Sequence, residues 1–120
     1  MTIHLYQQSK NKAYRLSEKT LQKLGFTLQT TDVNKGLLSG RKQLSRAGQF
    51  IFCDVHLTGS GQFIRLALIS NVFSGSTGTF TADAVTEELF LETFHGLLSI
   101  QPPDNPMKLS FEDYALAAGF

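Results

Sequence analysis

Residues 49–73 read QFIFCDVHLTGSGQFIRLALISNVF, and this stretch decides the fold of the chain. Both halves alternate between two faces with a period of two and are rich in β-branched and aromatic residues, which is typical of strands. The Gly-Ser-Gly at 59–61 suits a hairpin loop between them. The sequence therefore predicts two long antiparallel strands, at 49–58 and 62–73.

Shorter strands are expected on the N-terminal side of this hairpin. Residues 26–31 and 37–44 alternate in the same way and are separated by turn residues, so they extend the hairpin into a meander. Residues 1–8 can add a further strand, because Ile3 and Leu5 fall on one face.

Two main helices complete the pattern. Residues 11–24 have helical periodicity, with Ser9 placed to cap the N-terminus and Gly25 placed to end the helix. A second helix is expected to begin near Thr81 and to end before Pro102. Its predicted apolar stripe consists of Val85, Leu89, Phe90, Thr93 and Leu97.

These elements predict an α+β fold in the order (β)-α-β-β-β-β-α. We expect an antiparallel four- to five-stranded meander with both main helices packed on one face, followed by a short C-terminal helical tail. The domain is expected to span residues 1–101, and residues 102–120 are expected to pack on the domain or on a partner. The order resembles that of small α+β domains found in many bacterial proteins, a likeness of architecture that transfers no site.

Length and composition narrow the class of protein. With 120 residues and 42% hydrophobic content, the chain fits one globular domain with its own core. No run approaches the roughly 18 to 20 apolar residues of a membrane-spanning helix. Residues 1–6 lack the basic and apolar segments of a signal peptide. We therefore expect a soluble, cytoplasmic protein.

The cysteine and histidine residues give no local support for a metal site. Cys53 is the one cysteine, which excludes an internal disulfide, and it lies on an apolar strand face where a thiol is usually inert. His4, His56 and His95 show no metal-ligand spacing. We expect neither a metal nor a cofactor.

One polar set has catalytic potential. Asp54 and His56 share a strand face, and Arg65 lies on the same side of the next strand, so the three can form a general-base site or a ligand pocket. Because an aspartate and a histidine in this spacing are more often a structural pair, the chain is expected to be non-catalytic.

The net charge of +1 hides a division along the chain. Residues 1–60 carry nine basic and three acidic residues, whereas residues 61–120 carry two basic and seven acidic ones. Four of the cations lie on one face of the first helix, which can bind nucleic acid or another anionic surface: Lys12, Arg15, Lys19 and Lys23. No known nucleic-acid motif surrounds them, so pairing with the acidic second helix is the favoured interpretation.

The two faces of the central strands carry the most information about function. One face is fully apolar and is expected to meet the helices. The other face should be polar if water covers it, but aromatic and aliphatic residues recur there. We therefore expect a cover, which can be a second copy of the chain, its C-terminal tail or an apolar ligand.

These patterns predict a small interaction module that forms a homodimer or binds a protein partner. The second helix has a second apolar seam, formed by Leu91 and Leu98, which lie seven residues apart. This seam is expected to face the tail or a partner. The predicted interface residues on the strands and on this seam are Phe50, Phe52, Phe63, Ile69, Phe73, Leu91 and Leu98.

Overall fold

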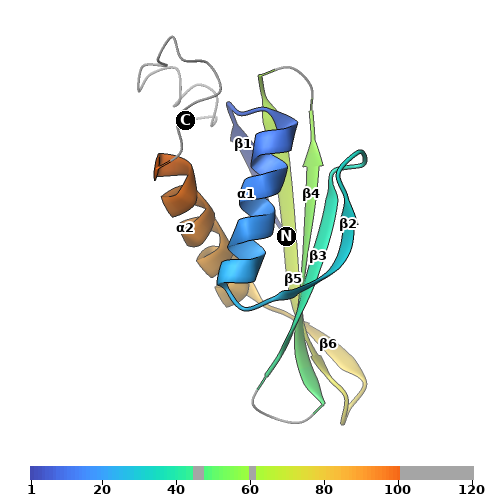
Figure 1. Ribbon diagram of the computed structural model, residues 1–120. Helices are drawn as coiled ribbons and strands as arrows, with labels where there is room; N and C mark the ends of the chain where they lie inside the picture. Colours follow the sequence, from blue (N-terminus) through green and yellow to red (C-terminus); the bar gives the residue numbers. More distant parts are fainter. Residues whose placement is uncertain (45–47, 60–61, 101–120) are drawn as a thin grey trace.

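The computed structural model describes residues 1–44, 48–59 and 62–100. Its elements follow one another as six strands and two helices (Figure 1). They are β1 (Thr2–Tyr6), α1 (Lys10–Lys23), β2 (Thr27–Asp32), β3 (Leu37–Gln43), β4 (Gln49–Thr58), β5 (Ile64–Ser74), β6 (Thr79–Ala82) and α2 (Ala84–Ile100). The predicted α+β class and the order of the main elements are confirmed. The predicted helical tail lies outside the described residues.

All described strands belong to one antiparallel sheet. The strand order is β1-β5-β4-β3-β2, and β6 pairs with the far end of β5. Both helices pack on one face, which we call the inner face (Figure 1). The sequence pattern did not predict β6, a four-residue strand in a stretch expected to be a loop and a helix cap.

Helix α1 begins and ends where the sequence predicts. The Ser9 side chain accepts a hydrogen bond from the backbone of Lys12 at 3.3 Å, which satisfies one free donor of the first turn. Gly25 has a φ of 91° and ends the helix, and the Phe26 backbone donates back to the Leu21 carbonyl at 2.9 Å. These two ends turn the apolar side of α1 toward the sheet.

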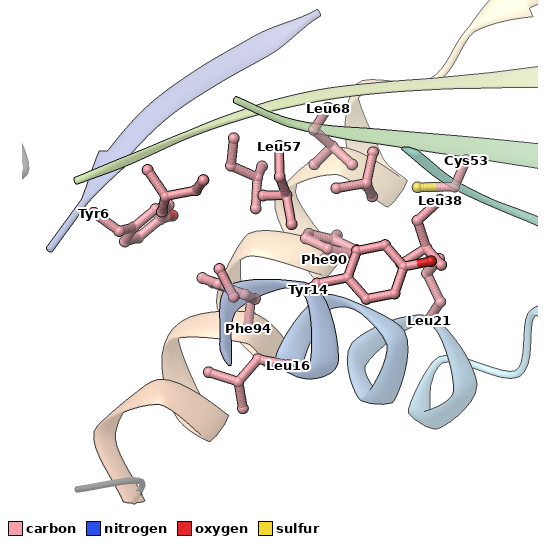
Figure 2. Packing of buried hydrophobic residues seen from close by; sticks show 14 of the residues in the cluster. Tyr6, Tyr14, Leu16, Leu21, Leu38, Cys53, Leu57, Leu68, Phe90 and Phe94 are labelled. Atoms are coloured by element: carbon pink, nitrogen blue, oxygen red, sulfur yellow. The ribbon is translucent and has the colours of Figure 1, made fainter. Parts of the chain in front are cut away.

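The core lies between this side of α1, the helix α2 and the inner face of the sheet. Tyr14, Leu16 and Leu21 of α1 meet Phe90 and Phe94 of α2 above side chains of β4 and β5 (Figure 2). The strand residues that face the helices and are almost fully buried include Leu38 of β3 and six residues of β4 and β5: Cys53, Val55, Leu57, Ile64, Leu66 and Leu68. Burial raises the pKa of Cys53 to about 12, as expected for an inert thiol in an apolar core.

Helix α2 is rotated relative to the stripe that its sequence predicts. Phe94 is fully buried, whereas Val85 and Leu89 are 66% and 47% exposed. The reason is a polar contact that periodicity does not reveal. On the edge of β5 that pairs with β1 and β6, Ser70 falls in the gap between these two strands, and the buried Glu87 carboxylate accepts its N–H at 3.4 Å. On the other edge, Ser70 lies opposite Cys53 of β4.

The same carboxylate fixes β1 to the helix. Glu87 also accepts a hydrogen bond from the Thr2 hydroxyl at 2.6 Å. Asp83 caps the helix by accepting from the Thr86 backbone and hydroxyl, and its own N–H donates to the Ser70 carbonyl. The first turn of α2 is therefore held to the sheet by hydrogen bonds instead of by Val85.

A cluster of rings joins β1 to the last turns of α2. Tyr6 is buried, and its hydroxyl lies 2.6 Å from Nε2 of His95. The His4 ring lies 6.2 Å from both the Tyr6 and the His95 rings. Burial, together with the neighbouring His4, lowers the pKa of His95.

Within the described ranges, neither helix is long and apolar enough to cross a membrane.

Candidate interaction surface

The outer face of the sheet, opposite to the helices, carries the side chains that alternate with the core residues. Strand register places these side chains in rows across β3, β4 and β5. The four rows are Leu37, His56 and Ala67; Ser39, Asp54 and Ile69; Arg41, Phe52 and Asn71; and Gln43, Phe50 and Phe73. Four of the predicted interface residues, Phe50, Phe52, Ile69 and Phe73, therefore lie on one continuous surface.

Three of these phenylalanines form an aromatic cluster with Phe80 of β6. The Phe73 and Phe80 ring centroids are 4.8 Å apart, and Phe52 lies 6.2 Å from Phe80 and 6.4 Å from Phe50. Phe80 is 64% exposed. This end of the sheet extends past the helices, and no described element covers the cluster (Figure 1). Phe50, Phe52 and Phe73 are half-buried, so Phe80 is the most exposed ring of the cluster.

A basic side chain completes the aromatic cluster. The Arg41 guanidinium lies 5.0 Å from the centre of the Phe50 ring, a distance at which a cation is attracted to the ring face. It is thus directed toward the row of Phe50. The row of Asp54 lies on the other side of Arg41.

Beside the aromatic cluster, the outer face is hollowed. The hollow has a volume of about 370 Å³. Leu37, Ala67, Ile69 and Met1 give it an apolar lining, and Ile69 remains 40% exposed. No element among the described residues fills it.

Two of the three residues of the predicted polar site line this hollow. Asp54 and His56 are both exposed at its floor, whereas Arg65 lies further along β5 beside Thr58 and Leu5. Desolvation raises the pKa of Asp54. Among the described residues, no hydrogen bond joins Asp54 to His56 and no cation pairs with Asp54. The hollow therefore holds a carboxylate that lacks an ionic partner.

The remaining predicted interface residues lie elsewhere. Phe63 immediately precedes β5 and is 52% exposed. Leu91 and Leu98 of α2 are half-buried and pack against the core, away from the outer face. The structure does not bring these three together with the aromatic cluster.

The basic residues of α1 lie on the helix side of the molecule. Arg15, Lys19 and Lys23 are exposed, and Lys12 is half-buried near the N-terminal cap. Within the described residues, Arg15, Lys19 and Lys23 form no ion pair, so these three do not make the expected pairs with the acidic second helix. Anion binding by this face stays a prediction.

Sequence reasoning missed several members of the outer surface. Met1, Ile3 and Leu5 extend its apolar part along β1, and Leu37 and Phe80 extend it along β3 and β6. The alternation of Ile3 and Leu5 was visible in the sequence, but nothing there shows that β1 pairs with β5. Phe80 carried no signal, because β6 is too short to show alternation.

The described residues hold no cluster of three or more histidine, cysteine or acidic side chains placed to bind a metal. No protein-family model matches the chain, and no curated protein matches it.

Proposed function

We propose that the chain is a small non-catalytic interaction module that associates with a second copy of itself through the outer face of its sheet. The observation that carries this proposal is the pair of neighbouring features on that face, the aromatic cluster and the apolar hollow. In the described part of the chain, Phe80 and Ile69 are exposed, and the other three phenylalanines are half-buried. Neighbouring apolar side chains that stay partly exposed are typical of an interaction site.

The size of the face supports a stable contact. The six strands hold about 43 residues, which at roughly 3.3 Å rise and 4.8 Å spacing cover roughly 680 Å². Specific interfaces of standard size bury roughly 600 to 1,000 Å² on each partner. The face is therefore large enough for a dimer without help from the helices.

The composition of the face also supports the proposal. Its centre is aromatic and aliphatic, with Phe52 and Ile69 near the middle, and its charged side chains are few. Aromatic residues and arginine are enriched at protein interfaces, and lysine and acidic residues are depleted. The outer face follows this pattern in its phenylalanines and in Arg41 and Arg65, whereas Asp54 departs from it.

The test is the molar mass of the purified chain by light scattering and by sedimentation at about 1 to 100 µM, because interfaces of this size have affinities of micromolar or tighter. We expect a dimer for the wild type and a monomer for Ile69→Lys, because the new charge would enter the apolar contact. Val85→Lys is the matched control, since Val85 is an exposed aliphatic residue on the helix side, and it should remain dimeric. A wild-type chain that is monomeric at every concentration would contradict the proposal. This holds both for a face that the C-terminal tail covers and for a face that stays uncovered.

A further inference from the structure

The outer face carries an aromatic cluster and an apolar hollow side by side on the same strands. The aromatic cluster lies on the rows of Phe50 and Phe52, and the hollow lies on the rows of Asp54 and His56. The two features are thus direct neighbours along β4. In a closed dimer with two-fold symmetry, each surface patch must contact a patch on the other copy, and the relation must hold in both directions.

One symmetry axis satisfies both features at once. This two-fold axis lies in the plane of the interface, perpendicular to the strands, and passes between the rows of Phe52 and Asp54. It places β4 of one copy over β4 of the other, with the two strands running in opposite directions. The rows of Phe50 and Phe52 of each copy then lie over the rows of His56 and Asp54 of the other. Aligned packing of this kind is a standard way for two sheets to bury a face.

The charges on the face fit the same arrangement. Filling the hollow with phenylalanine rings removes water from Asp54, and a buried carboxylate without a cation is strongly unfavourable. Arg41 accompanies the aromatic cluster, on the row next to that of Asp54. The axis places Arg41 of one copy over Ser39 of the other, and Ser39 is the direct cross-strand neighbour of Asp54.

We propose that the aromatic cluster of each copy occupies the hollow of the other, and that Arg41 of each copy pairs with Asp54 of its partner. This inference rests on the proposed self-association and specifies its register. Two identical ion pairs then flank the symmetry axis. Arg65 lies further along β5, outside the lining of the hollow, and takes no part in them.

Charge reversal in the full chain tests the register. Arg41→Asp and Asp54→Arg should each weaken the dimer at least about thirty-fold, because each variant places two like-charged pairs in the interface. An equimolar mixture of the two variants should regain dimer affinity as a heterodimer, since both of its pairs are then of opposite charge. An Arg41–Asp54 pair within one chain would not be restored by mixing, so the mixture isolates the contact between copies.

Controls keep the outcome decisive. Arg15→Asp makes the same charge change on the exposed side of α1, outside the outer face, and it should remain within about three-fold of wild-type affinity. Circular dichroism of each variant must show a folded chain, and the double variant Arg41→Asp/Asp54→Arg should dimerise with itself. A dimeric wild type whose single variants are unaffected, or are not restored by mixing, would overturn this register and leave the self-association intact. A monomeric wild type would overturn both.

Discussion

Two single variants, Phe94→Ala and Leu89→Ala, test how helix α2 packs. The structure buries Phe94, whereas the periodicity of the sequence predicts that Leu89 faces the core. Phe94 is fully buried, and its ring lies 5.1 Å from that of Tyr6 and 6.0 Å from that of Phe90. Removing a buried phenylalanine side chain costs about 3 to 5 kcal/mol of unfolding free energy. Leu89 is 47% exposed, so Leu89→Ala should cost less than about 1 kcal/mol.

Thermal unfolding followed by circular dichroism measures the difference. For a chain of this length, about 2.1 cal/mol/K of unfolding entropy per residue converts the loss at Phe94 into a decrease in Tm of about 12 to 20 °C. Leu89→Ala should move Tm by less than about 4 °C. All variants must be compared at one protein concentration, because association raises apparent stability. Equal losses for the two variants, or a larger loss for Leu89→Ala, would refute the packing of α2 described above.

Three further predictions concern protonation, a turn and the thiol. Lowering the pH below about 6.5 should destabilise the fold, because the pKa of His95 is lowered in the folded state and the unfolded chain therefore binds more protons. The decrease in Tm between pH 7.5 and pH 5 should be smaller for His95→Asn than for the wild type. Equal decreases in Tm would count against this role of His95. Gly36→Ala should lower the free energy of unfolding in urea by more than about 2 kcal/mol, because φ at Gly36 is +69° and an added Cβ would lie 2.1 Å from the Leu57 carbonyl oxygen. Gly78 has a similar φ but open space around it, so Gly78→Ala should cost about 1 kcal/mol. Equal costs for the two variants would exclude the clash. Cys53 should react with a thiol reagent such as DTNB only as fast as the protein unfolds, and rapid labelling of the native protein would contradict its burial.

The sequence predicts the sheet well because its strongest signals are local. Alternation over 49–58 gives the bounds of β4 as the structure has them, and Ser9 and Gly25 mark the ends of α1. The excess of apolar residues on the second sheet face is likewise a period-two pattern, and the structure places Phe50, Phe52, Ile69 and Phe73 together there.

What the sequence does not predict depends on contacts between distant segments. The rotation of α2 follows from Glu87, whose partners Thr2 and Ser70 are 85 and 17 residues away. The hollow forms because β1 pairs with β5 and brings Met1 beside Ile69. Pairing of this kind is set by the whole fold, so neither feature has a local signature.

The proposed self-association is tested most directly by mapping which residues respond to protein concentration. Two-dimensional amide NMR spectra of the full chain are recorded on dilution from about 1 mM to 10 µM, a range that includes the micromolar affinities that interfaces of this size can have. We predict that signals of outer-face residues on β3, β4 and β5, among them Phe52 and Ile69, shift or broaden, while those of Lys19 and Lys23 on α1 do not. Spectra that are unchanged and monomeric at every concentration, or changes confined to the helices, would contradict association through the outer face of the sheet.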